Sequence, residues 1–331
     1  MESNSTMKIV SRRDMLRTAA ALTGGALAAG FNLAPQTQAA ADFPQQQPHN
    51  DALTAMRAQF GKNPIVAQEL TDNLTMLSGP GGNVIVLHGP DGKLMVDTFV
   101  QSAWAPLQNT LNGIGKEPVK TVIDTHWHFD HADNNSLLRG IGATIVAHDN
   151  TKKRLSEPHF LAVLNMNFPA TPEMAWPQQT FKESRRLQTN GETIVMTHVP
   201  PAHTDSDLFV HFEKANVMHG GDVFGNRIYP YIDGGTGGSI NGMIAGAEKL
   251  LAMTDNNTKI VPGHGPLANK ADLKQYRDML VTVRDRVQKL KSSGKSIQEA
   301  VAAKPLADLD PVWGKALFNG DGFVQIVYLA S

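Results

Sequence analysis

The chain has 331 residues, with 30 lysines and arginines against 31 aspartates and glutamates, and 41% of its residues are hydrophobic. A formal net charge of −1 provides no global basic surface for nucleic acid, and the hydrophobic content is sufficient for a sizeable folded core. The sequence contains no cysteine, which excludes disulfides, thiolate metal sites and cysteine nucleophiles. Any metal ion must therefore be bound by carboxylates and by some of the 12 histidines.

The first 41 residues have the layout of a secretory signal peptide. Basic residues in 11–17 precede an uncharged stretch rich in Ala, Gly and Leu over 18–34, and small residues follow at 39–41. The pair Arg12-Arg13 resembles a twin-arginine signal, which implies an exported, periplasmic protein and the twin-arginine export machinery as a partner. No other stretch is apolar enough for a membrane span, so we do not expect an integral membrane protein.

After the signal, residues 42–64 are predicted to be a flexible lead-in, and residues 65–331 a single domain that ends in helices. Short apolar runs between Gly/Pro turns predict strands, and apolar residues spaced three or four apart predict helices. The predicted strands are 74–78, 83–88, 93–96, 119–124, 144–147, 192–198, 208–212, 217–220 and 259–261, and the predicted helices are 101–114, 240–253 and 271–292. Two strand-rich halves, each followed by helices, indicate two packed sheets with helices outside.

Seven potential metal ligands follow predicted strands. Four of them fall within six residues directly after the strand 119–124, and three more come later, beside other strand ends. In chain order they are His126, His128, Asp130, His131, His203, Asp222 and His264. Imidazole and carboxylate suit zinc, and they also suit iron or manganese. Seven ligands that share one carboxylate can hold two metal ions.

The motif His126-x-His128-x-Asp130-His131, with the three later ligands, resembles the metallo-β-lactamase superfamily over roughly residues 65–267. The resemblance implies an α+β fold, a four-layered αβ/βα sandwich. It also implies two Zn²⁺ ions, with iron or manganese as alternatives. His126, His128 and His203 would bind the first ion, Asp130, His131 and His264 the second, and Asp222 would bridge both.

The residue type at the bridging position differs between members of the superfamily that act on different substrates. β-Lactamases of the Cys-dependent subclasses have a cysteine there, whereas an aspartate such as Asp222 resembles glyoxalase II-like thioesterases, lactonases and phosphodiesterases. This argues against a dedicated β-lactamase and leaves promiscuous β-lactam cleavage open. Residues 202–207 read Ala-His-Thr-Asp-Ser-Asp and lack the Gly-His-Thr-x-Gly stretch usual in glyoxalase II, which weakens the glutathione thioesterase interpretation.

The resemblance therefore implies an exported dinuclear zinc hydrolase. A metal-bound hydroxide would attack the carbonyl of a small amide, lactone or ester, and Asp130 would orient this nucleophile and accept its proton. Asp124 is a candidate to orient a ligand imidazole, and Tyr229 and Tyr231 are candidates to donate to an oxyanion. The alternatives are a small-molecule phosphodiesterase, an iron-dependent oxidoreductase on the same scaffold and a binding protein without activity.

Overall fold

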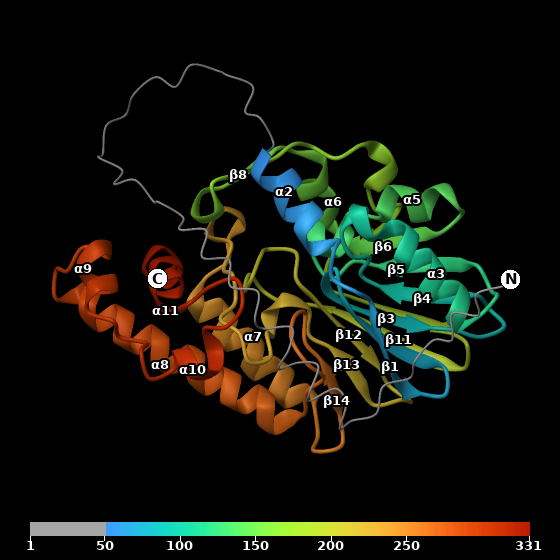
Figure 1. Cartoon of the computed structure of the whole chain (residues 1–331). Helices are drawn as coiled ribbons and strands as arrows, with labels where there is room; N and C mark the ends of the chain where they lie inside the picture. Colours follow the sequence, from blue (N-terminus) through green and yellow to red (C-terminus); the bar gives the residue numbers. More distant parts are fainter. Residues whose placement is uncertain (1–50) are drawn as a thin grey trace, which may run out of the picture.

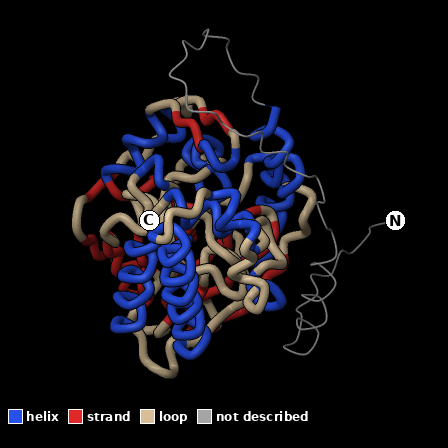
Figure 2. The backbone as a smooth tube through the Cα atoms, turned by 90° about the vertical axis from the view of Figure 1, so that its left-hand side faces the viewer, coloured by secondary structure: helices blue, strands red, loops and turns tan. Residues whose placement is uncertain are grey.

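The computed structural model describes residues 51–331, so the predicted signal peptide over residues 1–41 lies outside the described residues. Two β-sheets pack face to face, and helices cover both outer faces (Figure 1). Viewed from the side of the C-terminal helices, these helices lie in front of the strands (Figure 2). The four layers confirm the predicted αβ/βα sandwich of the α+β class.

The larger sheet has seven strands in the order β1-β2-β3-β4-β5-β6-β9. Strands β1 to β4 pair antiparallel, while β4, β5, β6 and β9 run parallel. Its members are β1 (Val66–Thr71), β2 (Leu74–Gly79), β3 (Gly81–Leu87), β4 (Lys93–Val96), β5 (Val119–Ile123), β6 (Thr144–His148) and β9 (Gln179–Phe181). The parallel pairing places the carboxyl ends of β4, β5 and β6 at one edge of the sandwich.

The smaller sheet has five strands in the order β10-β11-β12-β13-β14, with β13 and β14 parallel and the others antiparallel. Its members are β10 (Ser184–Thr189), β11 (Glu192–His198), β12 (Leu208–Phe212), β13 (Val217–His219) and β14 (Lys259–Val261). A separate hairpin joins β7 (His159–Leu161) to β8 (Met166–Phe168). All predicted strands are confirmed, with ends shifted by at most two residues, while β1, β7, β8, β9 and β10 were not predicted.

The helices form two outer layers. On the side of the larger sheet lie α2 (Asp51–Phe60), α3 (Trp104–Ile114), α5 (Asn135–Gly140) and α6 (Asp149–Ser156). On the side of the smaller sheet lie α7 (Ile240–Met253) and α8 (Lys270–Ser292), and α9 (Ile297–Ala302) and α11 (Gly320–Leu329) pack on α8, while α10 (Asp310–Trp313) joins the same apolar core. The one-turn helix α4 (Phe129–Ala132) carries part of the His-rich motif. Within residues 51–331, no helix combines the length and apolar character that a bilayer span requires.

The alternation of side chains between the two faces of each strand explains how each sheet packs on both sides. In β3, Val84 and Val86 face the helices, while Ile85 lies between the two sheets. In β12, Phe209 faces the helices and Val210 lies between the sheets. Because successive side chains of a strand point to opposite faces, each apolar run packs against a helix layer on one side and against the partner sheet on the other.

The prediction of a flexible lead-in over residues 42–64 is wrong for its second half. Residues 42–50 lie outside the described part of the chain, but α2 occupies 51–60. The Leu53 side chain is buried in the core between the larger sheet and its helices, and Met56 and Phe60 pack against that core. Arg57 makes a bidentate ion pair with Asp133, at 2.7 and 2.6 Å. The helix is therefore held by apolar burial and by an anchor beside the His-rich motif.

Two imidazoles join the ends of the two sheets. His148 ends β6 and His198 ends β11, and their rings stack with centroids 3.8 Å apart and an interplanar angle of 2°. His148 is the N-cap residue of α6, and its Nδ1 atom accepts a hydrogen bond from the backbone N–H of Asn150. Burial, followed by the His198 ring, lowers the pKa of His148. A hydrogen bond to the backbone of Lys182 opposes this shift, followed by Asp149 and Asp205.

We expect His148 to make stability depend on pH. Its neutral form is favoured in the folded chain, so its stabilising contribution is complete above the unfolded histidine pKa of about 6.5 and is lost as the pH falls below it. His148→Asn keeps an N-cap acceptor and removes the titration. The melting temperature of the variant should therefore fall less steeply than that of the wild type between pH 7 and pH 5. Parallel curves for the two proteins would contradict this role.

Candidate metal centre

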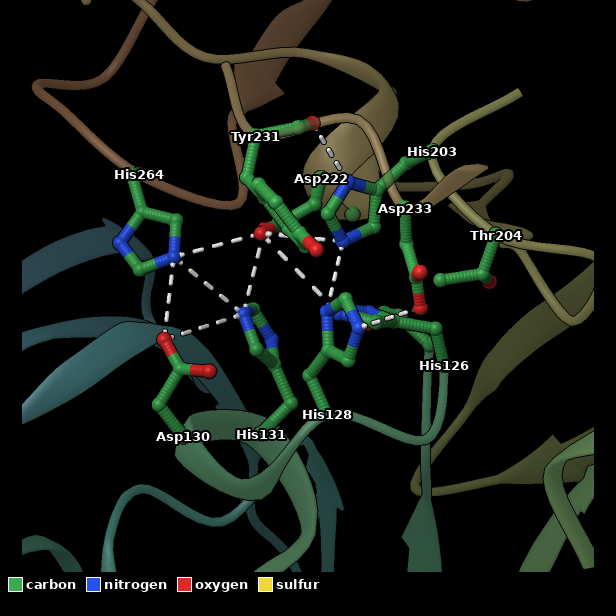
Figure 3. A network of polar contacts seen from close by, with 12 residues as sticks. His126, His128, Asp130, His131, His203, Thr204, Asp222, Tyr231, Asp233 and His264 are labelled. Atoms are coloured by element: carbon green, nitrogen blue, oxygen red, sulfur yellow. Dashed lines mark hydrogen bonds and ion pairs between the residues drawn. The ribbon is translucent and has the colours of Figure 1, made fainter. Parts of the chain in front are cut away.

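The structure brings all seven predicted ligands together, because the segments that carry them leave the same end of the two sheets. His126, His128, Asp130 and His131 follow β5, His203 lies between β11 and β12, Asp222 follows β13 and His264 follows β14. In the close view, their side chains converge on one small region (Figure 3). The convergence follows from topology, since β5, β11, β13 and β14 all present their carboxyl ends at this edge.

The first group of ligands consists of three imidazoles, those of His126, His128 and His203, and all three are buried. One nitrogen of each ring lies within 4.8 Å of the corresponding nitrogens of the other two. His203 Nε2 is 2.8 Å from His128 Nδ1. Three imidazole nitrogens at one point form the ligand pattern of a zinc site.

The second group consists of Asp130, His131 and His264, whose ligand atoms also lie within 4.8 Å of one another. His264 Nε2 is 3.2 Å from Asp130 Oδ2, and His131 Nε2 is 3.7 Å from the same oxygen. The side chain of His131 is fully buried, whereas that of His264 is 28% exposed. The second group is therefore the one that solvent reaches.

Asp222 lies between the two groups. Its Oδ1 is 3.1 Å from His131 Nε2, and its Oδ2 is 3.4 Å from His264 Nε2, both in the second group. The same Oδ2 is 3.6 Å from His203 Nε2 and 4.0 Å from His126 Nε2, both in the first group. One carboxylate thus reaches both sets of imidazoles, as a shared ligand must.

The electrostatics differ between the two groups. Burial and the neighbouring imidazoles lower the pKa values of His126 and His203, the latter to about 4. Burial would also lower the pKa of His264, but Asp222 and Asp130 outweigh it and raise the value to about 10. His126 and His203 therefore present neutral nitrogen lone pairs, while the carboxylates around His264 attract positive charge.

The outer nitrogens of four ligand rings are already hydrogen-bonded, which fixes which nitrogen faces inward. The Nδ1 of His126 lies 3.0 Å from Thr125 Oγ1, and the Nε2 of His128 lies 3.3 Å from Asp233 Oδ2. The Nδ1 of His203 donates to the backbone carbonyl of Tyr231 at 2.8 Å. Each partner holds its imidazole in the tautomer whose lone pair points to the common centre.

Asp97 performs the same task for His131. The Nδ1–H of His131 donates to Asp97 Oδ2 at 2.7 Å, and both side chains are fully buried. Asp97 also accepts hydrogen bonds from the backbone N–H and the hydroxyl of Thr125, at 2.7 and 2.8 Å. Its backbone has φ = 64°, in the left-handed region, so the residue turns the chain sharply after β4.

We expect Asp97→Asn to weaken metal binding by about 10–100-fold, the usual cost of losing such an outer partner. Asparagine tolerates the positive φ but has a single acceptor oxygen and no charge, so it cannot accept all three hydrogen bonds. Titration with zinc against a competing chelator measures the change. Asp285→Asn, at a side chain 60% exposed, is the matched control. Equal zinc affinity in both variants would contradict the role assigned to Asp97.

The donor set fits a pair of divalent cations. His126 Nε2 is buried and, among the described residues, has no hydrogen-bond partner. An unpaired buried nitrogen is costly unless a cation binds it. The inward atoms are five imidazole nitrogens and two carboxylates, the ligand types that zinc prefers in proteins that offer no thiolate.

The three auxiliary candidates from the sequence are placed differently. The Asp124 carboxylate accepts a hydrogen bond from Asn135 at 2.8 Å, and no described hydrogen bond joins it to a ligand imidazole, so Asp97 takes the predicted role. Tyr229 is buried, with its ring stacked on that of Phe323 in α11 at 4.7 Å, and no described contact joins it to one of the seven candidate ligands. The ring of Tyr231 lies 5.9 Å from that of His128 and 6.0 Å from that of His203.

Sequence reasoning missed the roles of Asp97, Asp233 and Gly82 at this site. A Cβ at Gly82 would overlap the ring of His131, and a Cβ at Gly263 would overlap Asp222 Oδ1. Both positions require the absence of a side chain. The sequence feature that could have identified Asp97 as a site residue is its position directly after a predicted strand. Gly82 and Asp233 had no comparable signal, since their contacts come from segments far away in the chain.

Two sheets between helix layers, with a buried His/Asp cluster at their common end, define an αβ/βα sandwich with a candidate metal centre. The sequence profile of the metallo-β-lactamase superfamily matches residues 77–264, more than half of the chain. The chain therefore belongs to the metallo-β-lactamase superfamily, whose members are mostly metal-dependent hydrolases.

Solved structures with the same fold are distant in sequence. A metallo-β-lactamase from Pontibacter korlensis is 16% identical with a TM-score of 0.53, over 65% of this chain and 98% of that protein. The DIM-1 metallo-β-lactamase is 19% identical with a TM-score of 0.54, over 66% and 98%. A sec-alkylsulfatase, Pisa1 from Pseudomonas sp., is 16% identical with a TM-score of 0.62, over 84% of this chain and 51% of that protein. The chain thus spans about half the length of the sulfatase.

Proposed function

We propose that this protein is a dinuclear zinc hydrolase that cleaves a small amide, lactone or ester. One observation carries the proposal: the Asp222 carboxylate lies 3.1–4.0 Å from imidazoles of both ligand groups. His126, His128 and His203 would hold one ion, and Asp130, His131 and His264 the other. When bound, such ions lower the pKa of water and polarise the bond that is attacked.

The side chains around the ions have separate tasks. Asp222 is engaged by both ligand groups, so Asp130 is the carboxylate better placed to accept a proton from the attacking water. Burial and the charge of Asp233 raise the pKa of Tyr231 above its ordinary value. Its phenol therefore stays protonated at neutral pH and can donate a hydrogen bond to a developing oxyanion.

Zinc-loaded protein that lacks residues 1–41 tests the proposal. We expect about two zinc ions per chain and chelator-sensitive turnover within a panel of a chromogenic cephalosporin, a lactone and an aryl ester. An alkyl sulfate and a phosphodiester complete the panel, because one structural neighbour is a sulfatase. Cleavage of the phosphodiester alone would favour the phosphodiesterase alternative. One iron ion per chain, without hydrolysis, would overturn the proposal in favour of an oxidoreductase.

We also propose that the protein is exported to the periplasm through the twin-arginine pathway, on the strength of the Arg12-Arg13 pair and the apolar stretch that follows it. Fractionation of a bacterial host should place the full-length chain in the periplasm. Replacing both arginines with lysine should retain it in the cytoplasm. Equal periplasmic yields from both proteins would contradict this pathway.

A further inference from the structure

Three segments of the chain meet around Tyr231. One is the loop between β13 and α7 that contains Tyr231, and a second is the β7–β8 hairpin. The third is residues 314–319, between α10 and α11. The rings of Tyr231 and Phe318 stack with centroids 6.1 Å apart, and Val163 of the hairpin packs on the same apolar cluster as both. The carbonyl oxygen of Phe160 lies 4.0 Å from where a Cβ at Gly235 would sit.

Two of these segments each expose a large apolar side chain, although Lys315 and Asn319 of residues 314–319 and Arg227 of the Tyr231 loop are exposed as well. Phe160 is 53% exposed and Leu317 is 48% exposed, two of the six large hydrophobic side chains exposed in residues 51–331. Phe318 and Tyr231 are half-buried. Exposed aromatic and aliphatic groups that gather at a site, rather than scatter singly, usually mark a surface that binds something.

Polar groups of the hairpin and the Tyr231 loop are already engaged. Asp233 accepts hydrogen bonds from His128, from the Thr236 hydroxyl and from the Gly235 backbone. His159 Nε2 is hydrogen-bonded to the carbonyl of Arg154 at 2.9 Å. The surface beside Tyr231 therefore offers apolar contact more than hydrogen bonds. Tyr231 links this surface to the metal centre, since its ring also faces His128 and His203 (Figure 3).

We propose that the stacked rings of Tyr231 and Phe318 form an apolar wall that binds an alkyl or aryl group of the substrate next to the bond that is hydrolysed. The preferred substrates are then lactones or esters with a medium-length apolar chain. This inference rests on the proposed function. Phe318 lies beyond the matched family segment 77–264, so the wall is a feature that the metal ligands do not determine.

Binding of straight-chain carboxylates to the zinc-loaded protein tests the wall without any need for turnover. We expect the dissociation constant, measured by calorimetry, to fall about twofold to fourfold per methylene from butanoate to octanoate, as contact with apolar surface predicts. Phe318→Ala should flatten this dependence, and Phe318→Leu should preserve part of it. Ile141→Ala removes a side chain that is 54% exposed on the opposite layer and should leave the dependence unchanged.

The outcomes separate the wall from the proposed function. Equal affinity for all chain lengths in the wild type would overturn the wall, and so would an unchanged dependence in Phe318→Ala. If chain length governs binding but no substrate is hydrolysed, the wall stands and the proposed function fails. With an active enzyme, Phe318→Ala should raise KM for an aryl octanoate and leave KM for an aryl acetate unchanged. A uniform loss of kcat on both esters would indicate a structural role and overturn the inference.

Discussion

Asp222→Ala is expected to lose at least one of two bound zinc ions and to reduce kcat/KM by more than about 100-fold. Even partners that only hydrogen-bond a metal ligand cost 10–100-fold, and Asp222 reaches both ligand groups directly. Its removal also takes away the main negative charge facing His131 and His264. Zinc content by elemental analysis and kcat/KM on the best panel substrate are the two measurements.

Asp222→Asn is the matched variant, because it keeps the size of the side chain and removes the charge. We expect it to bind zinc more weakly than the wild type and more tightly than the alanine variant. Chelator treatment of the wild type, followed by zinc, should abolish and then restore turnover. If Asp222→Ala kept two zinc ions and full activity, the shared-ligand assignment would be wrong.

The fold and the convergence of the seven candidate ligands were largely predictable, because both depend on local patterns. The apolar runs of β3 to β5 and β11 to β14 are bounded by turn residues, and each ligand follows one of these strands. Parallel and antiparallel pairing then bring the strand ends to one edge without further information. The helix α2 was missed because the Pro- and Gln-rich stretch before it suggested a lead-in, while the packing of Leu53 becomes visible only in three dimensions.

The orienting residues were not predictable for a physical reason that Asp124 illustrates. In β5, Val122 faces the helices and Ile123 faces the other sheet, so alternation turns Asp124 back toward Asn135 of α5. The side chain of Asp97 does not follow the alternating directions of the β4 side chains, because the positive φ of this residue turns the chain toward His131. A single backbone dihedral thus decides which of the two carboxylates orients an imidazole, and that dihedral has no clear sequence signature.

Tyr229 and Tyr231 show a similar limit. They lie two residues apart in one loop, and the sequence gives no reason to prefer either. In the structure, the backbone N–H of Tyr229 donates to the carbonyl of Trp313, and its ring packs among the C-terminal helices. Tyr231 instead places its carbonyl on His203 and its ring beside the ligands. The choice depends on helices that follow about eighty residues later, so it could not be made from the loop itself.

Gly263→Ala should damage the metal centre nearly as severely as the loss of Asp222, although residue 263 is not a ligand. The added Cβ would overlap Asp222 Oδ1 and would lie 2.7 Å from both the carbonyl carbon and the oxygen of Gly221. Gly263 also donates its N–H to the carbonyls of Gly221 and Phe224, at 2.8 and 2.9 Å, so the backbone is held on both sides. The overlap of the added Cβ can therefore be removed only if Asp222 moves or if the segment that carries His264 moves.

We expect Gly263→Ala to retain fewer than two zinc ions after dialysis against a chelator, and to be destabilised by about 1–3 kcal/mol, the usual cost of overpacking. Gly140→Ala is the matched control, because among the described residues no heavy atom lies within 4 Å of its added Cβ, and alanine favours a helix. Thermal unfolding and elemental analysis of both variants distinguish a specific effect from a general one. A Gly263→Ala protein that held two zinc ions would show that Asp222 can move without leaving either ion. The centre would then tolerate displacement of its shared ligand, contrary to the close packing that surrounds it.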